Sequence, residues 1–303
     1  MKYIKSLLII FSLTFLIANC TSPTGSEKGK IIGTIHMFYE PADSAKVKLL
    51  EKEEKGFIII DSTYTNNSGY FELRKISAGN YIIEACKFDT ISGYLFCTQT
   101  MEFYYDGKNT YDIGILEVTS AVDKPAIYIY PEEDSQFQVQ LILKNGTRIT
   151  KSIPEYKSGW DAFVEKSGRI NSKYDYLFYE ASIKIMPELS SGWCISQKNL
   201  RNELNDLLLK IGLNQKETKE FLDYWLKRLQ VYKYYKIFPV VNQQLDEFVE
   251  LDIAPQPQTI FRIWFFFQGS EKFVELSSPQ IKHFIRQGTT VIEWGGVLLN
   301  YEL

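Results

Sequence analysis

The sequence predicts a multidomain protein in which an N-terminal all-β sandwich is followed by an α+β domain with a helical hairpin packed on β-sheet. Residues 30–118 hold short β-branched and aromatic runs separated by turn residues, the pattern of a sandwich. Two stretches with helical spacing of apolar residues follow residue 199, with strand-like runs on both sides of them. The 303 residues, including 20 Tyr and 20 Phe, suit about two domains with large buried side chains.

The first element is a short apolar segment. Residues 1–5 carry two lysines, and residues 7–18 are apolar or small, which is typical of a secretory signal and shorter than the roughly 20 residues of a membrane span. The following "IANC" resembles the lipobox of bacterial lipoproteins, although Asn19 departs from the usual small residue. The resemblance implies that residues 1–19 are a signal peptide and that Cys20 is lipidated. The alternative is an ordinary signal peptide cleaved nearby, with Cys20 incidental.

The lipoprotein resemblance implies a place in the cell envelope. Residues 20–29 are small and polar and should form a flexible tether. A lipid on Cys20 would anchor the protein to a membrane, facing the periplasm or the cell exterior. Thr21, rather than Asp, follows Cys20, and by analogy with enterobacterial sorting this favours the outer membrane. The net charge is −3 and becomes −5 without residues 1–19, which hold two lysines and no acid, so we expect no nucleic-acid partner.

The next region, residues 30–118, is the predicted sandwich. Its runs "KIIGT", "AKVKL", "TNNSGYFEL" and "ISAGNYII" stand in an order that resembles a carboxypeptidase regulatory-like domain. The resemblance implies a prealbumin-like fold and a non-catalytic accessory role. Cys86 and Cys97 flank a turn at about residues 90–93, and we expect either a disulfide, as in exported proteins, or two small buried thiols.

A linker is predicted at residues 118–124, followed by the second domain at 124–303. "AIYIY" predicts a strand that ends at Pro131. The runs on either side of Asn145-Gly146 predict a hairpin with a three-residue loop that places Leu141 opposite Ile149.

Two helices are predicted next. Apolar residues spaced from Leu200 to Ile211 form one stripe, and Gly212 suits a helix end. Asn214 and Glu217 then form a capping box that starts the second helix. "FVELDIAP", "TIFRIWFFFQG" and "TTVIEW" predict strands, and a third helix is expected from about residue 278 to Gly288.

The blocks "KPAIYIYPE", "IPEYKSGW", "YDYLFYEA" and "GLNQKETKEFLDYW" resemble, in this order, an uncharacterised bacterial family with a KPxIYxYP motif. The resemblance covers residues 124–267. It implies a domain boundary and supplies no chemistry.

The sequence contains few residues or motifs typical of a catalytic site. There is no Gly-rich phosphate loop, HExxH motif, CxxC motif or nucleophile elbow, and the chain has two histidines, so we expect no metal site and no cofactor. The catalytic hypothesis is Cys194, shortly before a predicted helix, with His283 as its base, which would make an envelope hydrolase. The alternative is that Cys194 is a small buried residue.

Other charged residues allow further hypotheses. A glycosidase would need a pair of carboxylates, and the candidates are Asp161, Glu165, Asp175 and Glu180. Arg262 lies within an apolar strand and is expected to face solvent; if it is buried, Glu180 is its expected partner.

Aromatic residues provide the candidate binding surface. The "VYKYYK" segment interleaves lysines with Tyr232, Tyr234 and Tyr235, which could present rings to a glycan or protein partner. "YLFYEA" and residues 264–267 offer further rings, with burial in the core as the default. The sequence therefore favours a lipid-anchored, non-catalytic binding or scaffolding module, with the hydrolase as the alternative.

Overall fold

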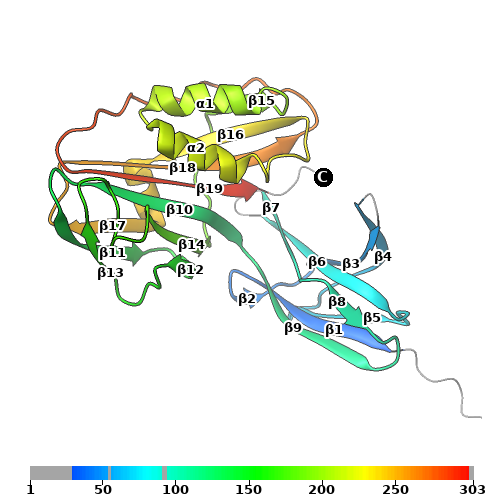
Figure 1. Ribbon diagram of the computed structural model, residues 1–303. Coiled ribbons are helices and arrows are strands. Elements are labelled where there is room, and N and C mark those ends of the chain that lie inside the picture. Colours follow the sequence, from blue (N-terminus) through cyan, green and yellow to red (C-terminus); the bar gives the residue numbers. More distant parts are fainter. Residues whose placement is uncertain (1–28, 54–55, 91–93, 300–303) are drawn as a thin grey trace, which may run out of the picture.

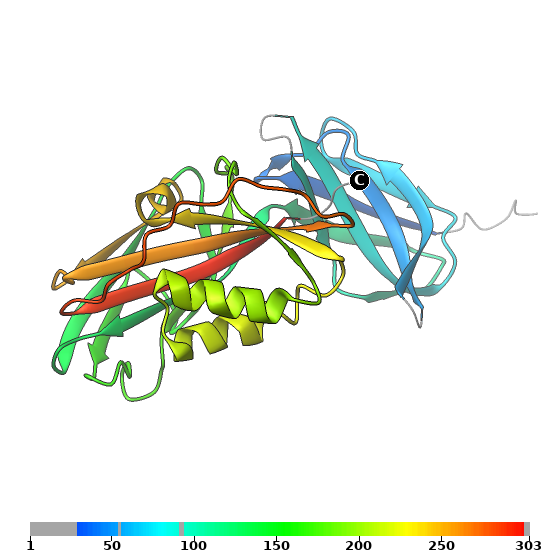
Figure 2. The same cartoon turned by 90° about the horizontal axis from the view of Figure 1, so that it is seen from above.

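The computed structural model describes residues 29–53, 56–90 and 94–299, and these residues form a mostly β protein with several sheets. A sandwich built from the first part of the chain lies at one end of a larger layered body that carries the helices (Figures 1 and 2).

The sandwich contains strands at the runs quoted from the sequence and further strands, among them β2, β8 and β9, that those runs did not predict. The strands are β1 (Lys30–Met37), β2 (Glu40–Pro41), β3 (Lys46–Glu53), β4 (Gly56–Tyr64), β5 (Tyr70–Arg74), β6 (Gly79–Asp89), β7 (Tyr94–Gln99), β8 (Phe103–Tyr105) and β9 (Thr110–Val118). One sheet has the order β2-β1-β5 with β9 parallel to β1, and the other has the order β4-β3-β6-β7 with β8 on β6. Ile31, Val47, Phe71 and Ile83 are buried between the two sheets, so the alternating residues of the sequence form this core.

A disulfide links two neighbouring strands, β6 and β7, at the edge of this sandwich. Cys86 on β6 lies directly opposite Cys97 on β7, with their Cα atoms 4.1 Å apart. Of the two alternatives for these cysteines, the structure therefore has the bonded one.

The rest of the described chain forms two sheets and the helices. The elements are β10 (Ser120–Tyr130), β11 (Ser135–Leu143), β12 (Arg148–Ile153), β13 (Trp160–Val164), β14 (Leu177–Ile183), β15 (Trp193–Ser196), α1 (Leu200–Ile211), α2 (Gln215–Trp225), β16 (Tyr234–Val241), the 3₁₀ helix η1 (Asn242–Glu247), β17 (Val249–Ala254), β18 (Thr259–Ser270) and β19 (Thr290–Leu299). The large sheet has the order β12-β14-β10-β19-β18-β16-β15, and the small sheet has the order β13-β11-β17.

The central strands of the large sheet are buried on both faces. In β18, Phe261, Phe265 and Phe267 pack towards the helices, while Trp264 and Phe266 pack towards the small sheet. The helices, the large sheet and the small sheet therefore form three layers (Figure 1). Strands covered on both faces read as continuous apolar runs, which explains the "IWFFF" sequence of β18.

The prediction that the strands flanking Asn145-Gly146 pair as a hairpin is wrong. The turn itself exists, because the Thr147 amide donates to the Lys144 carbonyl over 2.9 Å and both central residues have positive φ. The flanking strands do not pair with each other, since β11 joins β13 and β17 whereas β12 joins β14 in the large sheet. β11 buries Phe137, Val139 and Leu141 in the core between the two sheets, whereas β12 lies at the edge of the large sheet and has no buried residue. A local pattern could not show this separation into different layers.

The helical hairpin is present where the sequence predicts it. Gly212 ends α1 in the left-handed conformation, with φ 118°, and donates its amide to the Leu208 carbonyl. Asn214 and Glu217 form the predicted capping box, in which each side chain accepts the other residue's amide. Phe221 and Trp225 of α2 are fully buried against the large sheet.

The third helix, expected from residue 278 to Gly288, is not formed. This segment has no regular secondary structure and crosses the C-terminal end of α1 as it connects the parallel strands β18 and β19. The Phe284 amide donates to the Ile211 carbonyl over 2.8 Å, and Ile281 and Phe284 pack into the helix-side core. The carbonyl of Ile211 at the end of α1 thus accepts a backbone hydrogen bond from Phe284, which in a helix would have been made within the segment itself.

The linker expected at residues 118–124 is also absent. β9 ends at Val118 and β10 begins at Ser120, so the chain passes between the two parts almost without interruption. The guanidinium carbon of Arg148 lies 3.6 Å from the centre of the Tyr39 ring, and the hydroxyls of Tyr39 and Ser182 are hydrogen-bonded. Side chains of the sandwich therefore contact the large sheet directly.

Candidate functional site

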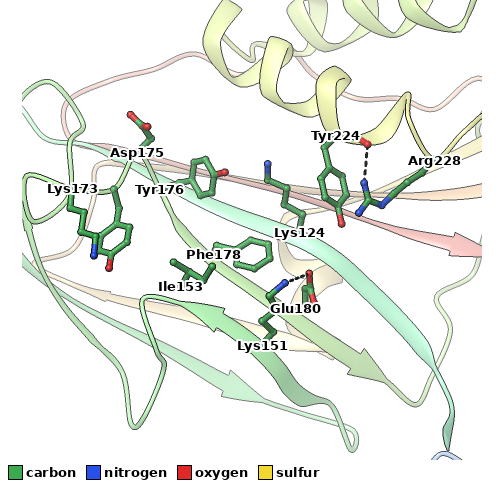
Figure 3. A pocket seen from close by; sticks show the side chains of 11 residues that line it. Lys124, Lys151, Ile153, Lys173, Asp175, Tyr176, Phe178, Glu180, Tyr224 and Arg228 are labelled. Carbon is green, nitrogen blue, oxygen red and sulfur yellow. Dashed lines mark hydrogen bonds and ion pairs between the residues drawn. The ribbon is translucent and has the colours of Figure 1, made fainter. Parts of the chain in front are cut away.

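A cavity of about 430 Å³ lies on the helix side of the large sheet, where the helices leave the sheet uncovered. Among the described residues, the buried helix-side core draws on β10, β19, β18, β16 and β15, and on neither β12 nor β14. The exposed edge formed by β12, β14 and the end of α2 makes the wall of the cavity. Its lining residues are Lys124, Lys151, Ile153, Lys173, Tyr174, Asp175, Tyr176, Phe178, Glu180, Tyr224 and Arg228 (Figure 3).

Lys124 is brought to this cavity by a bulge in β10. The pairing of β10 with β14 and with β19 is interrupted just before Ala126, and Lys124 has a positive φ of 52°. Pro125 follows and has no amide hydrogen, so it cannot donate to either neighbouring strand. A bulge redirects a side chain out of the regular alternation, and here the redirected side chain is a lysine.

The Lys124 ammonium is surrounded by aromatic rings. Its nitrogen lies 5.2 Å from the ring centre of Tyr176, 5.1 Å from that of Tyr224 and 5.5 Å from that of Trp294. Figure 3 shows the lysine standing between Tyr176 and Tyr224. Burial lowers the pKa of Lys124, with Glu220 opposing this change. The rings attract the cation through their negative faces.

Three further cations lie over rings of the same wall, namely Arg228 over Tyr224, Lys173 over Tyr174 and Lys151 over Phe178. The Arg228 guanidinium carbon lies 3.7 Å from the centre of the Tyr224 ring, and the Lys173 nitrogen lies 5.0 Å from that of Tyr174. Arg228 also donates to the Tyr224 carbonyl over 3.2 Å, which holds it against α2. The cavity thus combines ring faces with positive charges.

The two carboxylates of the wall already have cationic partners. Asp175 accepts from Lys216 at 2.8 Å and from Arg169 at 3.3 Å, and the hydrogen bond from Lys216 is the main cause that lowers the Asp175 pKa. Glu180 lies 3.5 Å from Lys151. The low pKa of Asp175 does not suit a general acid at neutral pH.

Asp123 lies beside the cavity and has an unusual pKa. Burial, followed by the neighbouring Glu180 carboxylate, raises the pKa of Asp123 to about 6. Burial also raises the pKa of Tyr224 to about 12, with Asp123 adding to the effect. Both changes follow chiefly from the burial of these two groups, which disfavours their charged forms.

The tyrosines predicted to bind a partner do not form a shared exposed face. Tyr235 is 1% exposed and belongs to the helix-side core, so its selection as a binding residue is corrected: its hydroxyl accepts the amides of Val231 and Tyr232 instead of facing a ligand. Tyr232 is half-buried against Gly269, and Tyr234 is half-buried with its ring centre 6.1 Å from that of Phe273.

The Cys194 and His283 side chains have separate surroundings. The Cys194 sulfur on β15 accepts the Val274 amide at 3.3 Å, whereas His283 Nδ1 lies 2.9 Å from the Lys210 carbonyl oxygen at the end of α1. Within the described part of the chain no hydrogen bond joins the two. A nucleophile and its base need such contact, directly or through one water.

The expectation that Arg262 faces solvent is wrong, and so is the partner suggested for it. Arg262 is 4% exposed, and its Nε donates to Glu293 at 2.5 Å and its Nη1 to Asp246 at 2.7 Å. Glu293 is fully buried and also accepts the Tyr179 hydroxyl at 2.7 Å and the Trp264 indole N–H at 3.2 Å. Arg262 is buried because the small sheet and η1 cover the face that the sequence left open.

The other candidates are scattered or lie outside the described residues. Asp161 is on the small sheet, and Glu165 accepts the Ser172 hydroxyl at 2.9 Å, so neither lines the cavity. The described residues contain no group of three or more His, Cys, Asp or Glu that could hold a metal ion, and no helix among them is long and apolar enough to cross a membrane. Cys20 precedes the described residues.

Sequence reasoning found part of this site and missed its centre. It singled out Asp175, Glu180 and the "YLFYEA" rings, but passed over Lys124, Tyr224 and Arg228. The Lys124-Pro125 pair, which lies within the central strand β10, was the available signal, because proline interrupts a ladder.

Comparisons with known proteins give limited similarity, and no family model matches this chain. An uncharacterized protein in the bglA 3′ region of Butyrivibrio fibrisolvens is 36% identical over 62 residues, which covers 19% of this chain and 64% of that protein, less than two thirds of its length. Among solved structures, a DUF3823 family protein from Bacteroides uniformis has a TM-score of 0.22 and 14% identity, covering 56% of this chain and 86% of its own. The major pilin subunit of Bacillus cereus has a TM-score of 0.23 and 11% identity, covering 75% and 67%. At these TM-scores neither structure informs the function.

Proposed function

We propose that this protein is a non-catalytic binding module of the bacterial cell envelope and that the cavity beside Lys124 holds a glycan. The observation that carries the proposal is the set of ring faces gathered on one wall, from Tyr174, Tyr176, Phe178 and Tyr224. Pyranose rings have apolar C–H faces that stack on aromatic side chains, and the surrounding cations can bond to their hydroxyls.

Several features support a binding role rather than catalysis. Asp175 and Glu180 are neutralised by neighbouring cations, and Cys194 and His283 are not hydrogen-bonded to each other. The cavity also lies against the paired strands β10 and β14 of the three-layer body, which suits recognition by a preformed surface.

The anchor and the domain identities are part of the same proposal. Cys20 would carry the lipid, residues 20–29 would form the tether, and the module at 30–118 would be a carboxypeptidase regulatory-like spacer in front of an α+β domain at 124–303. The Cys86–Cys97 disulfide supports an exported location, because such bonds persist in oxidising compartments. Mass spectrometry of the mature N-terminus, with Cys20→Ser as the control, tests the anchor.

Glycan binding is tested by presenting the full chain, purified in detergent, to an array of neutral and acidic oligosaccharides. The comparison is among the wild type, Tyr224→Ala and Tyr104→Ala, since Tyr104 is 65% exposed on the sandwich, away from the cavity. We expect Tyr224→Ala to weaken binding at least about tenfold, equivalent to about 1.4 kcal/mol, and Tyr104→Ala to bind as the wild type does. The proposal would be contradicted if the wild type bound no glycan on the array, or if Tyr224→Ala and Tyr104→Ala bound equally well.

A further inference from the structure

The charges around the cavity restrict the ligand further than its ring faces do. The wall carries Lys124, Lys151, Lys173 and Arg228 against Asp175 and Glu180. Lys151 is the cation that faces Glu180, and Asp175 is bound by two cations that do not line the cavity. Within the described residues, Lys124, Lys173 and Arg228 form no ion pair with a carboxylate.

The remaining acids near Lys124 form no ion pair with it among the described residues, although Glu220 and Asp223 partly offset the burial of its charge. Glu220 accepts the Tyr128 hydroxyl at 2.7 Å, and Asp223 is paired with Lys219 at 2.6 Å. Asp123, whose pKa is raised to about 6 by burial, is mostly ionised at pH 7, but no ion pair joins it to Lys124 among the described residues. In the cavity, therefore, several cations converge on ring faces, and the two carboxylates of the wall, Asp175 and Glu180, are already paired with other cations.

A half-buried lysine that contacts rings and has no ion-paired carboxylate is incompletely compensated. Aromatic faces offer it attraction but no hydrogen-bond acceptor, and an ammonium has three donors. The bulge at Lys124 places this charge between Tyr176 and Tyr224, within reach of a ligand that stacks on either ring (Figure 3).

We propose that the ligand is an acidic sugar whose anionic group binds the Lys124 ammonium while its ring stacks on Tyr176 or Tyr224. This inference rests on the proposed glycan-binding function and adds the charge of the ligand. Lys173 and Arg228 would receive the acidic groups of neighbouring sugar units. A hydrogen bond between charged groups strengthens binding about tenfold or more.

The test compares two probes of equal shape, trigalacturonate and its methyl ester, by isothermal titration with the full chain. We expect the wild type to bind the acid at least about tenfold more tightly than the ester. Lys124→Met should bring the two affinities together, and the exposed Lys173→Met should reduce the difference less. Lys198→Met, an exposed lysine that does not line the cavity, should leave it unchanged.

The folding of each variant is to be checked by circular dichroism. If Lys124→Met does not fold, Lys173→Met, which changes an exposed residue, tests the effect of charge in its place. Equal affinity for acid and ester in the wild type overturns the inference, as does an acid that does not bind. An array signal from neutral sugars that is lost in Tyr224→Ala would then leave the glycan-binding function standing, whereas an array without any signal removes both.

Discussion

The buried ion pair between Arg262 and Glu293 gives the sharpest stability prediction. In Arg262→Met the Glu293 carboxylate, which is fully buried, loses its cation but keeps the hydrogen bonds from Tyr179 and Trp264. Breaking a buried pair in this way destabilises proteins by about 3–5 kcal/mol. The two remaining donors place our expected loss at about 3 kcal/mol.

Lys144→Met provides the matched control. Lys144 and Glu250 also form a short pair, at 2.6 Å, but their side chains are 42% and 44% exposed. Solvent screens such a pair, so the expected loss is below about 1 kcal/mol.

Urea denaturation followed by tryptophan fluorescence measures both variants. All 5 tryptophans of the chain lie after residue 159, so the signal reports on the body that contains the ion pair. The double variant Arg262→Met/Glu293→Gln should lose less than the sum of its single variants, because the neutral amide leaves no unpaired buried charge. A loss in Arg262→Met no larger than in Lys144→Met would refute the reasoning.

Three further predictions concern other parts of the fold. Folding raises the pKa of Asp123 from 3.8 to about 6, so its protonated form stabilises the protein at low pH and this contribution is lost as pH rises through about 6. Asp123→Asn should therefore gain about 1–3 kcal/mol relative to the wild type between pH 4 and pH 8 in urea titrations; a difference independent of pH would contradict this. The Cys86→Ala/Cys97→Ala variant should lose about 2–3 kcal/mol by calorimetry, as expected for a short closed loop, and a reductant should affect the wild type alone. Asn214→Ala should lower stability by about 1 kcal/mol through loss of the α2 cap, with an unchanged urea midpoint as the contrary result.

Local features of the sequence determined the elements of this protein. The helix end at Gly212 and the capping box at Asn214 and Glu217 depend on hydrogen bonds between residues three or four positions apart, so the residues involved can be recognised in a short stretch of sequence. The sandwich strands followed from alternation, and the Cys86–Cys97 alternatives followed from a turn between two of them.

Only the tertiary structure decided which faces are covered and which side chains meet. Contacts with layers distant in sequence decide three features of the fold. They are the separation of β11 from β12, the burial of Arg262 and the irregular conformation of the segment before Gly288. The cavity depends on them too, since Lys124 and Tyr224 are 100 positions apart and meet because a bulge in β10 faces the end of α2. Sequence periodicity records whether a residue is apolar, but the covering layer determines whether its face is buried, and that information is not local.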